Sequence, residues 1–214
     1  MKRQSPLLTA ALCIAALSMT ACDRDILPGA DLEMSGFVTC STNDNGHIIM
    51  IENDMGQKFT VNDSRYVLGR NTKSRRICTY VIGQDSSAAI RSLYIPKCNA
   101  ATDIGSIEQE RHIFDPVGIE SAYIGGGYLN VVMTVMTHDE TSYMRHYLET
   151  VRLDSTDSLV FSFIHNANGD VPVYSKKMYF CIPLSAYSLQ KNDAVFLKYR
   201  NYREEDCCLK YVYR

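Results

Sequence analysis

Short apolar runs separated by turn residues fill the chain from residue 35 onward, and none of them shows the period of a long helix. In the first of two such regions, Asn43-Asp44-Asn45-Gly46 lies between two apolar runs. Asn-Gly in that position indicates a hairpin, because both central turn residues take positive φ. We predict strands at 36–40, 47–52, 58–61, 77–82 and 89–97. Five short strands within residues 35–98 predict a small five-stranded β-barrel of the OB type.

The second region, 113–214, alternates apolar and polar positions more regularly. Residues 119–124 and 128–137 flank three glycines, Gly125 to Gly127, which we predict as a hairpin turn. A nucleotide-binding loop is not indicated, because strand periodicity and not a helix follows these glycines. Further strands are predicted at 143–153, 158–166, 176–182, 194–200 and 207–213. These runs predict an all-β chain in which an antiparallel β-sandwich follows the barrel after a linker at 99–112.

The first 22 residues have the pattern of an exported lipoprotein. Two basic residues precede an uncharged stretch at 6–17, which at about a dozen residues is shorter than the ~20 that a spanning helix needs. Leu17-Ser18-Met19-Thr20-Ala21-Cys22 resembles a lipobox, whose cysteine is acylated and becomes the first mature residue. We predict a signal peptide at 1–21, lipidation at Cys22 and a lipid-anchored tether at 22–34. An ordinary signal peptide in which Cys22 is incidental is the alternative.

The predicted export limits the partners of the mature chain. Removal of the signal leaves 20 of the 22 basic residues against all 24 acidic ones, a net charge of −4. That balance indicates no nucleic-acid partner, and the membrane is reached through the lipid on Cys22. We expect the outer membrane or the cell surface, with a periplasm-facing position as the alternative, and an unknown protein or glycan as partner.

The sequence leaves open whether the cysteines form disulfides or stay reduced. Cys13 is removed with the signal and Cys22 carries the lipid. The cysteines that remain are Cys40, Cys78, Cys98, Cys181, Cys207 and Cys208. Outside the cytoplasm they could pair as disulfides whose connectivity the spacing does not reveal, or they could stay reduced as small apolar residues. No C-x-x-C occurs, so neither a zinc nor a thioredoxin motif is indicated.

A cluster of cations falls between the third and fourth predicted strands. Its members are Arg65, Arg70, Lys73, Arg75 and Arg76. Because OB barrels bind oligomers with their strand faces and loops, this segment is a candidate loop for an acidic glycan, headgroup or protein. A solvated loop without a ligand is the alternative.

Two histidines in the second region are predicted to meet. If residues 154–157 form a hairpin loop, the register places His146 directly opposite His165, at the spacing of cross-strand neighbours. Asp170 follows closely and is a candidate third partner. The three side chains could hold a metal ion or act in hydrolysis, whereas a hydrogen-bonded pair at the end of a sheet is the alternative.

Several short motifs in this order resemble the NigD-like family of bacterial lipoproteins. After the lipobox these are Asp115-Pro116-Val117, Gly127-Tyr128-Leu129-Asn130-Val131 and Phe163-Ile164-His165-Asn166-Ala167. The resemblance implies an N-terminal OB-type domain, a C-terminal β-sandwich and a bacteriocin-immunity role. It supplies no catalytic residues.

Together these features favour a non-catalytic, lipid-anchored envelope protein that binds a protein, peptide or glycan and needs no cofactor. No Ser-His-Asp, Cys-His or paired-carboxylate pattern is legible in the chain. One alternative is a metal-dependent or hydrolytic enzyme that uses His146, His165 and Asp170. Another is a structural subunit of an envelope complex.

Overall fold

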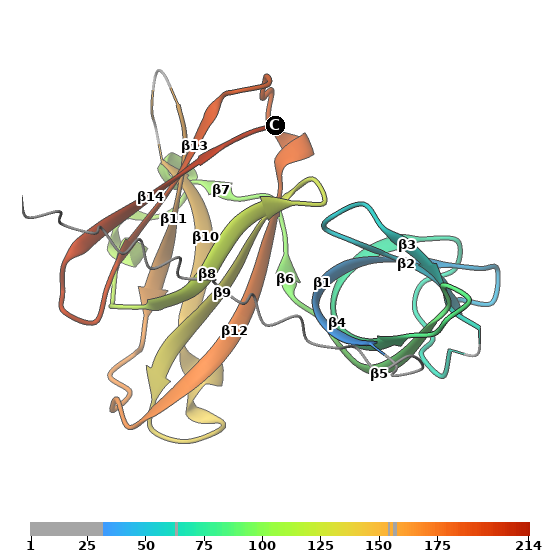
Figure 1. The fold of residues 1–214 in the computed structure, drawn as a ribbon. Coiled ribbons are helices and arrows are strands. Elements are labelled where there is room, and N and C mark those ends of the chain that lie inside the picture. The colour runs from blue at the N-terminus through green and yellow to red at the C-terminus, as the bar shows by residue number, and fades with distance from the viewer. Residues whose placement is uncertain (1–31, 63, 154, 156–157) are drawn as a thin grey trace, which may run out of the picture. The chain divides into compact units, whose positions relative to one another are not determined.

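The N-terminal strands form one strongly curled sheet. The computed structural model describes residues 32–62, 64–153, 155 and 158–214. Its first strands are β1 (Leu32–Thr42), β2 (Ile48–Asn53), β3 (Lys58–Thr60), β4 (Lys73–Ile82) and β5 (Ala88–Tyr94). They are ordered β3-β2-β1-β4-β5, and Figure 1 shows the sheet curling back on itself. In the described residues, its edges meet only at a parallel bridge between Thr60 and Ser87, so the barrel stays partly open.

A turn joins the first two strands where the Asn-Gly pair predicted one, but only Gly46 has the positive φ that was expected of both Asn45 and Gly46. The side-chain oxygen of Asn43 accepts hydrogen bonds from the backbone N–H groups of Asn45 and His47, both at 3.0 Å. Gly46 has a φ of +83°, which a side chain at that position would disfavour. This local chemistry joins β1 to β2 as a hairpin.

The remaining strands form two facing sheets. They are β6 (Lys97–Cys98), β7 (Thr102–Asp103), β8 (Gly118–Gly125), β9 (Tyr128–Thr137), β10 (Tyr147–Leu153), β11 (Leu159–Asn166), β12 (Tyr174–Pro183), β13 (Ala194–Arg200) and β14 (Asp206–Val212). One sheet has the order β14-β13-β11-β10-β7 and the other β6-β12-β9-β8. The fold is therefore all-β, with a partly open barrel followed by a β-sandwich.

The sandwich is mixed and not purely antiparallel. The pairs β7 with β10, β6 with β12 and β11 with β13 are parallel, which corrects the antiparallel prediction. Two of these pairs arise because the segment after the barrel supplies an edge strand to each sheet. The segment 99–112, expected as a linker, thus contributes β7, followed by the 3₁₀ turns η1 (Ile104–Ser106) and η2 (Gln109–Arg111).

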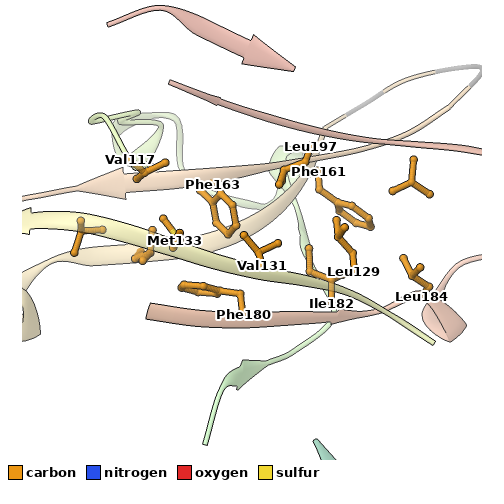
Figure 2. Packing of buried hydrophobic residues seen from close by; sticks show 13 residues of the cluster. Val117, Leu129, Val131, Met133, Phe161, Phe163, Phe180, Ile182, Leu184 and Leu197 are labelled. Atoms are coloured by element: carbon orange, nitrogen blue, oxygen red, sulfur yellow. The ribbon is translucent and has the colours of Figure 1, made fainter. Parts of the chain in front are cut away.

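The core of the sandwich follows the predicted alternation along β9. Leu129, Val131 and Met133 share one face of that strand, and each is fully buried. Figure 2 shows them pointing toward Phe161 and Leu197 of the facing sheet. Burial of this apolar area on both inner faces is the main force that holds the two sheets together.

Regular helix is confined to short turns in the described residues. Besides η1 and η2 these are η3 (Ser142–Arg145) and η4 (Leu184–Ala186). None of the helical segments in the part of the chain that the structure describes has the length and apolar character to cross a membrane.

Candidate functional site

Three side chains at one end of the sandwich form a continuous hydrogen-bonded chain. His165 lies near the end of β11, His146 directly precedes β10, and Asp170 lies in the turn between β11 and β12. The ring atoms His165 Nε2 and His146 Nδ1 are 3.2 Å apart, and His146 Nε2 is 3.0 Å from Asp170 Oδ2. His165 Nδ1 reaches the backbone oxygen of Asp115 at 3.2 Å. We refer to Asp170, His146 and His165 as the histidine chain.

The predicted meeting of the two histidines is correct, but the predicted register is wrong. His165 pairs with Leu148 and not with His146, because Leu153 pairs with Val160. Six residues therefore lie between the paired positions Leu153 and Val160, where four were expected. A shift of two positions keeps every side chain on the same sheet face, so the histidines still converge.

Proton counting limits the hydrogen bonds that the histidine chain can form. Its three contacts, from Asp170 to His146, to His165 and to the Asp115 oxygen, need three protons if each is to be a hydrogen bond. Two neutral imidazoles carry only two protons. A pair of neutral imidazoles therefore leaves one of the three contacts without a proton.

The environment shifts the pKa of both outer members, His165 and Asp170. Burial lowers the pKa of His165 from its ordinary value of 6.5, and the neighbouring His146 acts in the same direction. Burial alone would raise the pKa of Asp170, but hydrogen bonds from Thr137, His146 and the His138 backbone together lower it to about 2. Asp170 is therefore a carboxylate at neutral pH and can accept a hydrogen bond from His146 Nε2.

A half-open cavity of roughly 750 Å³ lies against this group. His165 and Asp170 contribute to its wall, together with Met136, Pro172 and Tyr202. Its volume falls in the range of ligand pockets, about 300–1,000 Å³. The arrangement combines an apolar lining with a few convergent polar groups, as binding pockets do. We call it the sandwich cavity.

Exposed apolar residues flank Pro172 of the cavity wall in the chain. Val171, Val173 and Tyr174 surround Pro172 in the chain, and they are 56%, 52% and 60% exposed. Large apolar groups left in water next to a pocket are typical of a contact surface for another macromolecule. We call these three residues the cavity edge.

The histidine chain does not present a ready metal site. Within the described residues, no group of three or more His, Cys, Asp or Glu side chains is placed to hold a metal ion. Both ring nitrogens of His146 and both of His165 already have hydrogen-bond partners. A metal would have to displace those partners, so the geometry suits a proton relay or a rigid support better than a coordination sphere.

The five predicted cations do not form one binding loop. Lys73, Arg75 and Arg76 belong to β4, which corrects their placement in a loop. Arg65 donates to the backbone oxygen of Arg91 at 2.9 Å, and Arg70 is exposed. Arg75 and Arg76 point to opposite faces of β4, because successive residues of a strand alternate. A ligand-binding role for Arg65 and Arg70 stays a prediction.

Arg75 is a buried, paired residue, which the sequence did not indicate. Its side chain is 1% exposed and forms an ion pair with Asp54 of the turn after β2. Arg75 Nη2 also donates to Asn130 Oδ1 in β9 at 3.0 Å, and its guanidinium lies 5.0 Å from the ring centre of Tyr128. The Tyr123 hydroxyl donates to Asp54 Oδ2 at 2.7 Å. We call Asp54, Arg75, Tyr123 and Asn130 the junction network, because it joins barrel and sandwich residues.

The predicted glycine turn has a second role at this network. Gly126 and Gly127 form the two-residue turn between β8 and β9, with φ of +60° and +85°. A Cβ on Gly126 would lie 2.5 Å from Asp54 Oδ1 and 2.8 Å from Arg75 Nη1. The turn therefore needs glycine both for its backbone and for the approach of the ion pair. Consecutive glycines were the only signal of this contact in the sequence.

The candidate lipidation site cannot be compared with the structure. Cys22 lies outside the described residues. Its acylation, the signal peptide at 1–21 and the tether as far as residue 31 stay predictions. The predicted end of the tether at 34 is corrected, because residues 32–34 belong to β1.

Solved structures of low sequence identity share the fold. A NigD-like immunity protein from Bacteroides caccae has a TM-score of 0.69 at 22% identity, over 85% of this chain and 97% of that one. A protein of Parabacteroides distasonis considered to be toxin-related gives 0.68 at 19%, over 85% and 94%. A candidate lipoprotein of Bacteroides fragilis gives 0.60 at 8%, over 86% and 98%. No curated protein sequence matches this chain.

The family is established by a match to a sequence model. Residues 101–211 match the model of the NigD-like C-terminal β-sandwich domain, which begins just before β7 and ends within β14. The matched segment contains the histidine chain and the cavity edge, and it covers just over half of the 214 residues. This chain belongs to the NigD-like family.

Proposed function

We propose that this chain is a lipid-anchored, non-catalytic protein of the cell envelope that binds a polypeptide at the sandwich cavity and so protects the cell in the manner of an immunity protein. The observation that carries the binding role is the apolar cavity edge beside a pocket of roughly 750 Å³. A polypeptide fits this surface because it can place apolar side chains in the pocket and extend over the exposed edge. The family and the names of the structural neighbours support the immunity role.

The histidine chain supports a binding protein over an enzyme. His146 is enclosed by its two partners, with 3% of its side chain exposed, and no ring nitrogen is left free to activate a water or a nucleophile. A hydrolytic or metal-dependent enzyme at His146, His165 and Asp170 is the second candidate, favoured by the convergence of these three groups. It requires an activity that His165→Ala abolishes while the fold stays intact.

The lipid anchor is tested with the full chain and a Cys22→Ser variant in a bacterial host that acylates lipoproteins. We expect the wild type to incorporate an alkyne-labelled fatty acid and to sediment with membranes, whereas the variant does neither. Equal labelling of both chains would exclude Cys22 as the anchor.

The binding role is tested by survival. Host cells producing the full chain are challenged with bacteriocin-containing culture fluid from Bacteroides and Parabacteroides strains. We expect protection by the wild type and its loss with Val171→Glu combined with Val173→Glu, because both side chains lie on the cavity edge. Ile95→Glu is the matched control, since Ile95 is 78% exposed outside this edge. If the double variant still protected the cells, the cavity edge would not be needed for protection.

A further inference from the structure

One pair of cysteines lies in register on neighbouring strands. Cys98 of β6 is the partner of Cys181 in β12, and the two strands run parallel. Neighbouring strands lie about 4.8 Å apart, and register partners point to the same sheet face. That separation is within the Cα–Cα range of disulfides, about 4.4–6.8 Å.

The chemistry of the two thiols is complementary. A hydrogen bond from Cys181 lowers the pKa of the Cys98 thiol against the opposing effect of burial, and the charges of Arg75 and Arg76 act in the same direction as that bond. The same hydrogen bond and burial raise the pKa of Cys181. Cys98 is thus the thiol that reaches the thiolate state more readily, and a thiolate is the species that attacks a disulfide.

The other thiols in the described residues lack this arrangement. In the barrel, Cys40 pairs with Ser74, whereas Cys78 pairs with Gly36, four positions away along the strands. Burial raises the pKa of Cys40 to about 11 and that of Cys78 to about 12, so both stay protonated. Cys207 and Cys208 are consecutive in β14 and point to opposite faces of their sheet.

We propose that Cys98 and Cys181 form an intramolecular disulfide in the exported protein. The Cys98 thiolate attacks the disulfide of an envelope thiol-oxidising protein, forming a mixed disulfide and releasing one of the oxidant's sulfurs as a thiolate. The Cys181 thiolate then attacks the Cys98 sulfur and releases the second. Two electrons and two protons pass from the chain to the oxidant, whose disulfide becomes two thiols.

The location of this bond gives it a structural role. Both cysteines pack with Phe37 and Ile77 of the barrel and with Tyr179 of the sandwich. The bond would tie β6, the first segment after the barrel, to a central strand of the sandwich. It would therefore restrain the chain where the two domains meet, beside the junction network.

The experiment maps disulfides in the full chain, extracted from membranes in detergent without reductant. Free thiols are blocked with N-ethylmaleimide in denaturant, and peptides are identified before and after reduction. We expect a linked peptide pair containing Cys98 and Cys181, with the thiols of Cys40, Cys78, Cys207 and Cys208 blocked. Blocking of all six thiols, or linkage of Cys98 to any other cysteine, would overturn the proposal.

A second arm separates this inference from the proposed export on which it rests. The purified full chain is reduced and then reoxidised in a buffer of reduced and oxidised glutathione, so the result does not depend on where the cell places the protein. We expect the disulfide between Cys98 and Cys181 to form again. Reduction should lower the melting temperature of the wild type and of the double variant that carries Cys207→Ser and Cys208→Ser. Reduction should not change the melting temperature of the double variant that carries Cys98→Ser and Cys181→Ser. Failure of the pair to form in this buffer would refute the inference, whereas failure of Cys22 labelling would refute only the anchor.

Discussion

The junction network and the histidine chain both bury charged groups, yet they differ in what those groups face. Arg75 is enclosed by residues of both domains, and Asp54 supplies the opposite charge directly. The histidine chain belongs to the sandwich alone, and His165 and Asp170 form part of the wall of an apolar cavity. The first arrangement suits a structural link between domains. The second suits a rigid support for a binding surface.

Burial and charge alone therefore do not identify a functional site. Arg75 and His146 have side chains 1% and 3% exposed, and each is matched by a carboxylate. What separates the two groups is the space beside them and the exposed apolar residues around it. This difference yields predictions about stability at the junction and about pH dependence at the histidine chain.

The largest effect is expected from Arg75→Met. Removal of the guanidinium leaves the Asp54 carboxylate without its ion-pair partner and Asn130 without its donor. Breaking a buried pair on one side costs about 3–5 kcal/mol, and we expect the lower end because Asp54 is partly exposed. Urea unfolding measures the loss. Arg70→Met is the control, since Arg70 is exposed and should change the free energy of unfolding by less than about 0.5 kcal/mol. A similar small change at Arg75 would exclude a structural role for the junction network.

A smaller effect is expected from Gly126→Ala, with Gly127→Ala as its matched control. Both residues have positive φ, so both alanines carry backbone strain of about 1 kcal/mol. Only at position 126 does the added Cβ meet Asp54 and Arg75, whereas at 127 it meets nothing within 4 Å. We expect Gly126→Ala to cost about 1 kcal/mol more than Gly127→Ala in thermal or urea unfolding. Equal costs would mean that the contact with the ion pair is not needed.

The smallest effect is a pH dependence that belongs to the histidine chain. Because the pKa of His165 is lower in the folded state than its ordinary 6.5, the unfolded chain takes up a proton first as the pH falls. The stability contributed by neutral His165 is complete above pH 6.5 and declines below it. Asp170 adds a further decline from its ordinary 3.8 toward about 2.

Urea midpoints at pH 7.5 and pH 5.5 test the histidine part of this dependence. We expect the wild type to lose stability between these values and His165→Gln to lose less. His138→Gln should behave as the wild type, because His138 is exposed in the turn after β9. An identical loss in wild type and His165→Gln would place the titrating group elsewhere.

Strand faces were predictable because alternation repeats over many residues. Leu129, Val131 and Met133 were placed on one face from their spacing alone, and all three are buried. The other face of β9 was not predictable in the same way. Asn130 is fully buried there because it meets Arg75, which is 55 residues distant in the sequence.

Two features of the site could not be predicted from the sequence: the length of the loop between β10 and β11, and the position of the cations at the start of β4. Nothing in the sequence of 154–157 determines whether Leu153 pairs with Ser158, with four residues between them, or with Val160, with six residues between them. The predicted register was therefore wrong by two while its parity was right. Lys73, Arg75 and Arg76 looked like a solvated loop because cations are rare inside strands. The partners of Arg75, Thr39 and Asp54, come from other elements and have no local signature.

The most direct test of the account asks whether the histidine chain binds a metal. Zinc is titrated by calorimetry into the metal-free full chain and into His146→Ala, with circular dichroism to check that the variant is folded. We predict no saturable heat that depends on His146, because both of its ring nitrogens are already hydrogen-bonded. A saturable, near-stoichiometric heat in the wild type that is lost in His146→Ala would contradict the account and favour a metal-dependent enzyme.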